Sequence, residues 1–313
     1  MIVESPQRRI GMKILIVAIP VWLALSGGVG LWLHFHQQEK ERQEQKHAYR
    51  KDIDEKSLAD DFTKISRQLG ARHYATEPAR DALMRMASMI EGALGPNNIG
   101  YEVKKLAGKD RSGVSAPLLT VDVLRRKTEQ EIWLIVPYDS PPELPVGQAS
   151  ASAVAVSFAV AQSLVGQTLD RNVRLMYVPM AFADEQDRLD TAAQVKRLIS
   201  VQGEPYQVLV LGSMLHDGAL QLHTRDASQP AARESEDLVS PTANAAICLQ
   251  DDGEFSSLLL EMNLPAALLL KASAGEMTAL QEDEMPAGTK IMADAADQVL
   301  RLLRRMAFEV QKK

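Results

Sequence analysis

The hydrophobic pattern predicts a pair of helices at the start of the folded part of the chain. The first helix, over residues 57–69, has apolar side chains at helical spacing at Leu58, Phe62, Ile65 and Leu69. Gly70 is suited to end it, because glycine tolerates the backbone turn after a last helical residue. A second amphipathic segment opens at Glu77 and Pro78, runs to Leu94 and is closed by Gly95.

Short apolar runs then alternate with helical segments to the end of the chain. The predicted strands are Tyr101–Leu106, Leu118–Leu124, Ile132–Val136, Asn172–Val178, Val208–Leu211 and Ala266–Leu270. The predicted helices are Ser152–Val165, Asp187–Ser200 and Ile291–Val310. This alternation predicts an α/β fold with a mostly parallel central sheet flanked by helices. Thr224–Ala245, rich in Ser, Pro, Ala and Glu, is expected to be an exposed insertion.

An uncharged apolar run, Ile14–Leu33, precedes these elements and predicts one transmembrane helix. Its length suffices to cross the hydrocarbon core of a bilayer, and Trp32 lies near one end, where interfacial aromatic residues collect. The alternatives are a cleaved signal peptide and a buried core helix. A signal peptide has a shorter apolar region and a small-residue cleavage site, and a core helix would show a polar face. We therefore favour a membrane anchor.

The expected layout is a short basic tail (1–13), the transmembrane helix (14–33), a charged juxtamembrane stalk (34–56) and one domain (57–313). Gln37–Lys56 alternates acidic and basic residues with almost no apolar stripe, which is typical of a solvated helical stalk. The simplest orientation keeps the basic tail inside and the large domain outside. In a bacterium, this places a single-pass protein in the inner membrane with its large domain in the periplasm.

Composition excludes some functions. The formal net charge of −6, without a basic stripe interleaved with aromatic residues, argues against nucleic-acid binding. Cys248 is the only cysteine, so the chain can form neither an intramolecular disulfide nor a cysteine-based zinc site.

The segment Glu131–Leu164 is the most informative part of the sequence. A buried-type strand leads into a polar, proline-rich loop with Tyr138, Asp139 and Ser140, and a small-residue helix begins near Ser150–Ser152. In open α/β sheets, ligands bind at the carboxyl ends of strands, which is where this loop lies.

Its sequence, EIWLIVPYDSPPELPVGQASASAVAVSFAVAQSL, resembles the core of the two-zinc exopeptidases of the aminopeptidase-Y and glutaminyl-cyclase type, roughly xxHYDSPxxxPGANDNASGVAxxLExAxxL. Three further segments are similar to that family. They are LGARHYATEPARDALMRMASMIEGAL, FADEQDRLDT (the family's FxxEEQGLxGS) and EFSSLLLEMNLPAALLL. The resemblance implies a zinc-exopeptidase-like fold for the whole domain.

The resemblance also implies a ligand set that this chain mostly lacks. In the family, two zinc ions are held by two histidines, two acids and a bridging aspartate, with a glutamate as general base. The first histidine falls on Pro137, the bridging aspartate on Ala149 or Ser150, and a later aspartate near Leu211-Gly212. The last histidine would follow the Ala266–Leu270 strand, yet no histidine lies beyond His223.

Asp139 and the base-and-ligand pair Asp184-Glu185 remain at relic family positions, so we expect neither a metal nor a cofactor. His216 and His223 are the only histidines expected near the old site. The adjacent acids have an alternative role at a helix start, where they would meet the macrodipole favourably. Ser140, Ser150 and Ser152 lie in no G-x-S-x-G elbow.

The sequence therefore predicts a catalytically inactive, membrane-anchored, aminopeptidase-like domain that acts as a binding or assembly module in a cell-envelope complex. Other envelope or membrane proteins are the expected partners, and a peptide is a further candidate ligand. Tyr138, Asp139, Ser140, Asp184 and Glu185 are the candidate binding residues, and no catalytic residue is expected. The alternatives are an active metallo-aminopeptidase-like hydrolase with unorthodox ligands and a non-catalytic peptide-binding receptor.

The membrane anchor is testable by fractionation. The full-length chain should stay in the membrane fraction after a carbonate wash, whereas a chain that starts at Ser57 should be released, because an apolar span of this length inserts almost irreversibly. Recovery of a mature chain that begins just after Gly30 would instead identify a signal peptide.

Overall fold

The computed structural model describes residues 32, 53–107, 116–123, 130–142, 147–167, 169–215, 220–224, 228–234, 240–243, 252–271 and 285–308. The chain divides into two compact units, Met1–Tyr49 and Arg50–Lys313, and the elements discussed below belong to the second. The expected tail (1–13), the expected span (14–33, except Trp32) and the stalk up to residue 52 lie outside the described residues. Within the described ranges, no helix is long and apolar enough to cross a membrane.

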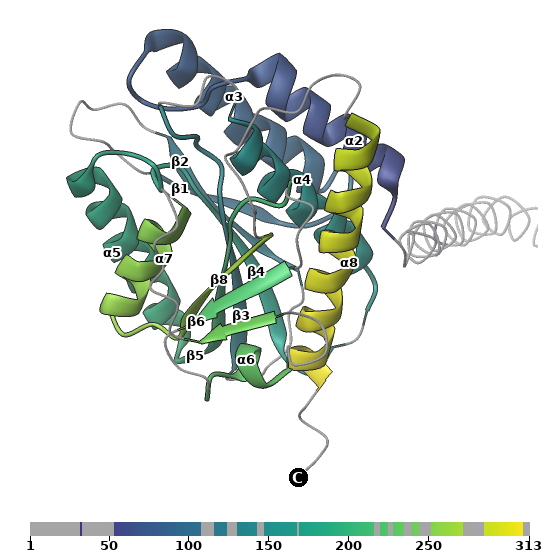
Figure 1. The fold of residues 1–313 in the computed structure, drawn as a ribbon, viewed down its shortest axis with the longest axis vertical. Coiled ribbons are helices and arrows are strands. Elements are labelled where there is room, and N and C mark those ends of the chain that lie inside the picture. Colours follow the sequence, from purple (N-terminus) through teal and green to yellow (C-terminus); the bar gives the residue numbers. More distant parts are fainter. Residues whose placement is uncertain are drawn as a thin grey trace, which may run out of the picture. The chain divides into compact units, whose positions relative to one another are not determined.

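The strands form one eight-stranded sheet in the order β1-β2-β4-β3-β5-β8-β6-β7 (Figure 1). They are Val103–Ala107 (β1), Pro117–Asp122 (β2), Glu131–Pro137 (β3), Asn172–Val178 (β4), Pro205–Leu211 (β5), Leu220–Thr224 (β6), Ser240–Ala243 (β7) and Ala266–Lys271 (β8). The four central strands β4, β3, β5 and β8 run parallel, as expected. The pairs β1–β2, β2–β4 and β6–β8 are antiparallel, so the sheet is mixed. Only nine residues separate Ala107 at the end of β1 from Pro117 at the start of β2, whereas a parallel pair needs a crossover connection of a dozen or more residues.

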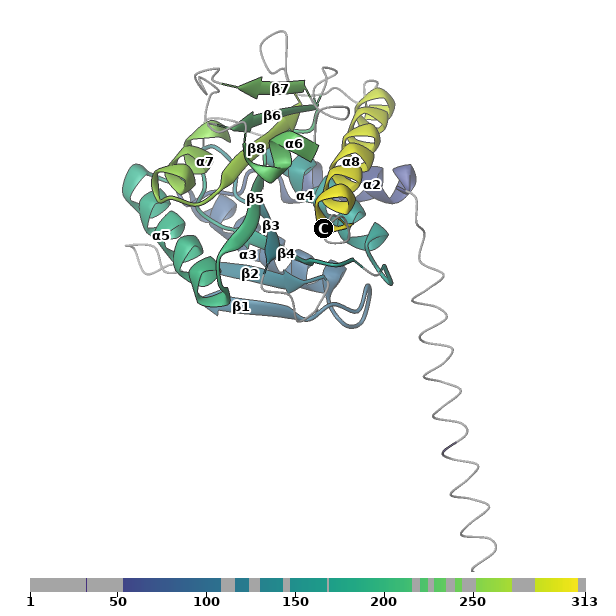
Figure 2. The same ribbon diagram turned by 90° about the horizontal axis from the view of Figure 1, so that it is seen from below.

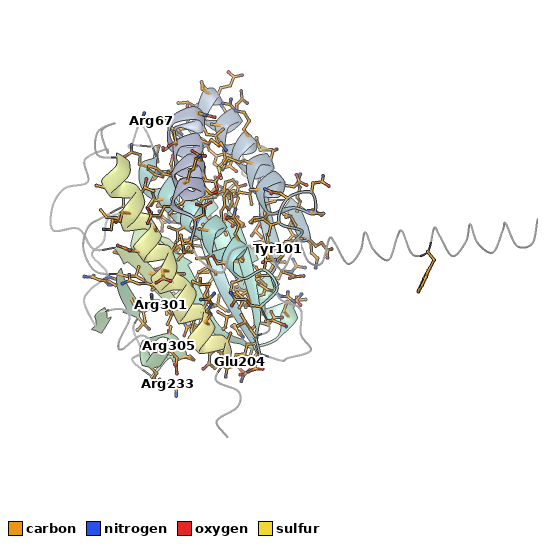
Figure 3. All side chains as sticks on the ribbon, turned by 90° about the vertical axis from the view of Figure 1, so that its right-hand side faces the viewer. Arg67, Tyr101, Glu204, Arg233, Arg301 and Arg305 are labelled. Carbon is orange, nitrogen blue, oxygen red and sulfur yellow. The ribbon has the colours of Figure 1, made fainter. Side chains whose placement is uncertain are left out.

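The helices lie on both faces of the sheet (Figure 2). They are Glu55–Thr63 (α2), the π-helix Lys64–Leu69 (η1), Glu77–Leu94 (α3), Gln148–Ser163 (α4), Glu185–Gln202 (α5), Pro230–Glu234 (α6), Asp252–Glu261 (α7) and Met285–Phe308 (α8). One hydrophobic core joins α2, η1, α3, α4, α6 and α8 to the sheet, and a second core joins α5 and α7 to its other face. The exposed Arg301 and Arg305 lie along α8 in Figure 3, on the side away from the core.

Strand β3 is the centre of both cores, because every one of its residues is buried. Ile132, Leu134 and Val136 belong to the larger core, whereas Trp133 and Ile135 belong to the core under α5 and α7. Successive strand residues point to opposite faces, so a strand covered on both faces is apolar along its whole length. The continuous apolar run in the sequence follows from this position.

The segment 224–245 differs from the expected exposed insertion. It contributes the short helix α6 and the edge strand β7, which pairs with β6. Ala231 and Ala232 of α6 are buried. The buried Gln207 of β5 accepts a hydrogen bond from the Ala231 backbone N–H at 3.1 Å and donates one to the Pro265 carbonyl at 2.5 Å. A buried amide of this kind needs partners, and α6 supplies one of them.

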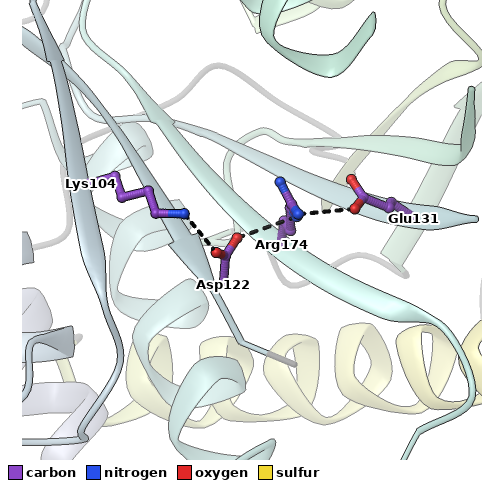
Figure 4. A network of polar contacts seen from close by, with 4 residues as sticks. All are labelled: Lys104, Asp122, Glu131 and Arg174. Carbon is purple, nitrogen blue, oxygen red and sulfur yellow. Dashed lines mark hydrogen bonds and ion pairs between the residues drawn. The ribbon is translucent and has the colours of Figure 1, made fainter. Parts of the chain in front are cut away.

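Four charged side chains form a ladder across β1, β2, β4 and β3 (Figure 4). Asp122 lies between Lys104, whose Nζ is 3.1 Å from Oδ2, and Arg174, whose Nε is 3.3 Å from Oδ1. Arg174 Nη2 is 3.0 Å from Glu131 Oε1. Both carboxylates are nearly buried, whereas the Lys104 side chain is half exposed. Arg174 is therefore the cation on which both acids depend.

Replacing Arg174 with methionine should lower the free energy of unfolding by roughly 2–3 kcal/mol at neutral pH, because it leaves two nearly buried carboxylates without their shared cation. Lys104→Met, the control, should cost less than about 1 kcal/mol, since its ammonium is half exposed. Burial already raises the pKa of Glu131, so the deficit of the Arg174 variant should shrink at acid pH, where the acids become protonated. Urea unfolding at two pH values measures both effects. Equal losses for the two variants would contradict this account.

Candidate functional site

The candidate site lies at the carboxyl end of β3, where Tyr138, Asp139 and Ser140 follow the strand. Tyr138 is completely buried. Its hydroxyl donates a hydrogen bond to the Pro117 carbonyl at 2.7 Å, and its backbone N–H donates one to the Val178 carbonyl. Burial raises the pKa of Tyr138 well above its ordinary value, so the phenol stays neutral. Tyr138 therefore anchors the loop and is not presented to a ligand.

The side chain of Arg72 holds the segments around the site together through hydrogen bonds. It is fully buried just beyond η1, in the loop before α3. Its five N–H groups are all used: Nε donates to the Tyr138 carbonyl, Nη1 to the carbonyls of Ile65 and Gly70, and Nη2 to the Gly147 carbonyl and Ser150 Oγ at 2.8 Å. A guanidinium has five donors in a rigid planar fork, so it fixes the relative positions of the groups that accept them.

Three segments that are distant in sequence therefore meet at Arg72. They are the end of η1, the loop after β3 and the start of α4. Burial lowers the pKa of Arg72 to about 10, and the negative charge of Asp139 opposes that shift. The guanidinium is thus still charged at neutral pH, and its charge is spread over neutral acceptors.

Ser140 and Gly147 close the same junction. The Ser140 backbone N–H donates to the Arg72 carbonyl at 2.7 Å, and the Arg72 backbone N–H donates to Ser140 Oγ at 2.9 Å. Gly147 has a left-handed backbone with a φ of 54°, and a Cβ there would come within 2.8 Å of the Ser140 Cβ. The glycine is therefore required by both conformation and space.

The serines at the start of α4 are structural. Ser150 Oγ accepts from Arg72, and Ser152 Oγ accepts from the Met214 backbone N–H at 2.9 Å while it donates to the Ala149 carbonyl. Neither caps the helix, since Gly147 is the N-cap residue and carries no side chain. Ser152 ties α4 to the chain just beyond β5.

Asp139 is buried, with 2% of its surface exposed. Its Oδ2 accepts a hydrogen bond from the Phe182 backbone N–H at 2.8 Å, while Oδ1 has no hydrogen-bond partner. Burial raises the pKa of Asp139 to about 7, although the backbone N–H groups of Phe182 and Ala181 and the charge of Arg72 act in the opposite direction. Asp139 therefore connects the loop after β3 to the loop between β4 and α5.

Asp184 and Glu185 are placed differently, because both are exposed at the start of α5. Asp184 is the N-cap residue, and its Oδ1 accepts from the Asp187 backbone N–H at 3.0 Å. Glu185 occupies the first turn of α5, where a negative charge meets the helix dipole favourably. In the structure, these two acids therefore have the alternative role considered from the sequence, which is to stabilise the start of a helix.

The residues present do not fit a pair of zinc ions. Across the described ranges, no three histidine, cysteine, aspartate or glutamate residues gather so that they could hold a metal. Pro137 and Ala149, at two of the old ligand positions, are buried, and their side chains have no lone pair that could bind a metal. The hydroxyl of Ser150 accepts a hydrogen bond from Arg72. His223 is buried in β6, where Nε2 bonds Gln221 Oε1. His216 lies outside the described residues.

Arg72 and Phe182, like Gly147 and Met214, are residues of the site that the sequence analysis did not single out. Arg72 lies inside a segment already recognised as similar to the zinc exopeptidases, and a charged residue two positions after a helix-ending glycine was the available signal. Phe182 contributes a backbone N–H, which no side-chain pattern reveals. The other candidates, Tyr138, Asp139 and Ser140, are consecutive in the sequence and therefore lie together in the structure.

This fold is similar to those of several solved proteins. No family model matches the sequence, and no curated protein matches it. BSAP, a zinc aminopeptidase from Bacillus subtilis, is 9% identical and has a TM-score of 0.64, and the match covers 84% of this chain and 97% of that one. The Legionella pneumophila LapA aminopeptidase is 14% identical with a TM-score of 0.61, over 86% of this chain and 75% of that one. Porphyromonas gingivalis glutaminyl cyclase is 15% identical with a TM-score of 0.56, over 80% of this chain and 98% of that one.

These likenesses establish the fold, which is that of the zinc exopeptidases. The architecture expected from the segment Glu131–Leu164 is thereby confirmed. Identities of 9–15% say nothing further about the chemistry of this chain.

Replacing Arg72 with methionine should lower the free energy of unfolding by at least about 3 kcal/mol, because it strips the donors from buried carbonyls and from Ser150. Arg72→Lys should recover little of this loss, since a single ammonium cannot reproduce the planar fork. Arg67→Met is the matched control: Arg67 is exposed on η1 (labelled in Figure 3), and its loss should cost below about 1 kcal/mol. Chemical unfolding measures all three. Full recovery by lysine would show that charge alone matters.

Proposed function

We propose that this protein is a membrane-anchored, catalytically inactive, aminopeptidase-like module that binds or assembles other proteins in the cell envelope. Its expected location is the bacterial inner membrane, with the large domain in the periplasm. Other envelope or membrane proteins are the proposed partners, and a peptide is the proposed ligand class if the site after β3 takes part.

The observation that carries the proposal is the present use of the old ligand positions. The scaffold of a two-zinc enzyme is kept, but its remaining carboxylates do not converge on one point. Asp139 is buried and bonded to the Phe182 backbone, whereas Asp184 is exposed and caps α5. Paired zinc catalysis needs several ligands around two close ions, together with a base aimed at the bound water.

Among the described residues, the site also lacks a nucleophile and base of another kind. Ser140, Ser150 and Ser152 make their hydrogen bonds with backbone groups and Arg72, and none is bonded to a histidine in the described contacts. A serine nucleophile needs an adjacent base within hydrogen-bond reach. What remains is an α/β domain that follows a predicted membrane anchor in the sequence, and this combination supports a role in binding.

The purified full-length chain should bind far less than one zinc per molecule, keep its melting temperature in chelator and show no turnover of aminoacyl substrates. The double variant Asp184→Asn with Glu185→Gln should be stable to within about 1 kcal/mol, because asparagine also caps helices and Glu185 contributes only a helix-dipole interaction. Metal analysis, thermal melting and peptidase assays on both proteins measure this.

Cleavage by the wild-type chain that is abolished in the double variant would overturn the proposal in favour of a hydrolase with unorthodox ligands. A melting temperature that falls in chelator would do the same. Partner capture from detergent-solubilised membranes then locates the contact. Loss of partners in the double variant would place the contact at the start of α5, and retention would place it elsewhere on the chain.

A further inference from the structure

The Asp139 carboxyl joins two loops at the carboxyl edge of the sheet. It belongs to the loop after β3, and its Oδ2 accepts the Phe182 N–H at 2.8 Å from the loop between β4 and α5. Asp184, two residues beyond Phe182, caps α5. The position of the first turn of α5 is therefore coupled to a single buried carboxyl group.

This carboxyl group is incompletely satisfied. Oδ1 is buried without a hydrogen-bond partner, and a buried charge with an unfilled acceptor is costly. Arg72 is the nearby cation, but all five of its donors are bonded to Tyr138, Ile65, Gly70, Gly147 and Ser150. It therefore forms no ion pair with Asp139 and acts on it only as a charge at a distance.

Among the residues that the structure describes, the other ionisable groups around Asp139 do not offset its charge. Tyr138, from its own loop, stays neutral because its pKa is raised, and Tyr74, from the loop before α3, belongs to the same cluster. On the α5 side, Asp184 and Glu185 are acids exposed to solvent. None of these groups can compensate for a negative charge on Asp139.

We propose that Asp139 is a proton-controlled latch: the neutral acid holds the loop of residues 179–184 and the first turn of α5 closed, and the ionised carboxylate releases them. The latch is a property of this junction and does not depend on the proposed binding role. It gives the domain a pH-dependent shape at the edge of the sheet where ligands of α/β proteins bind.

The direction of the pH dependence follows from proton binding. Burial raises the pKa of Asp139 from 3.8 to about 7 in the closed structure, whereas an opened loop returns the carboxyl to water and to its ordinary value. The closed form thus binds a proton that the open form does not. Closure is favoured at low pH, and opening rises up to tenfold for each pH unit until about pH 7.

Hydrogen exchange of the full-length chain in detergent tests the latch. The amides of residues 180–188 should show an opening constant, after division by the intrinsic exchange rate, that rises at least tenfold between pH 5 and pH 7. At pH 7 it should exceed the opening constant of the α8 core at residues 292–303, since those amides exchange only when the whole domain unfolds. Equal constants for the two segments at every pH would mean global unfolding alone and would overturn the latch.

Asp139→Asn should remove the pH dependence of the 180–188 segment, because an amide does not ionise in this range. Asp184→Asn is the matched control: it removes an acid from the same loop but keeps the helix cap, and its pH profile should equal that of the wild type. An Asp139→Asn chain that retains the wild-type profile would refute the assignment. If this variant does not fold, infrared titration of the wild-type aspartates decides, since the absence of a buried carboxyl that titrates near neutral pH would equally refute it.

Discussion

The burial of one guanidinium is the constraint on which the rest of this structure depends. A charged group in the interior is tolerable only if its donors are satisfied, and Arg72 satisfies all five with four carbonyls and one hydroxyl. Those acceptors come from η1, the loop after β3 and the start of α4, so none of the three can move alone. The same requirement explains Gly147, because only a residue without a side chain brings its carbonyl this close beside Ser140.

This arrangement explains how an enzyme scaffold can persist without metal ligands. Structural metals stabilise a fold by tying loops together, and here hydrogen bonds between protein groups tie the described loops at the end of β3. Arg72, Ser140 and Ser152 link η1, α4 and the chain beyond β5. These contacts hold the chain around Pro137, the position to which the resemblance assigns a ligand histidine.

The predictable parts of the fold are those whose buried positions are marked by apolar residues in the sequence. The continuous apolar run of β3 and the periodic apolar positions of α3 required no knowledge of distant residues. By contrast, β6, α6 and β7 lie in polar or mixed sequence, and α6 is held by Gln207, a β5 side chain. Arg72 was missed for the same reason, because four of its acceptors are backbone carbonyls and the fifth, Ser150 Oγ, lies far along the chain. A charged residue in sequence carries no sign of the carbonyls that will surround it.

The two kinds of remnant carboxylate show why site chemistry is harder to predict than fold. Asp139 and Asp184 are the same residue type at neighbouring strand ends, and the resemblance to zinc exopeptidases marks both. One meets no solvent and only one of its oxygens is bonded, so its protonation is linked to the closure of the loop. The other is exposed to solvent and accepts a hydrogen bond from the Asp187 backbone N–H, so its charge stabilises the start of α5. Both residues carry a carboxyl group, but their different exposure to water determines whether that group is charged and what it does.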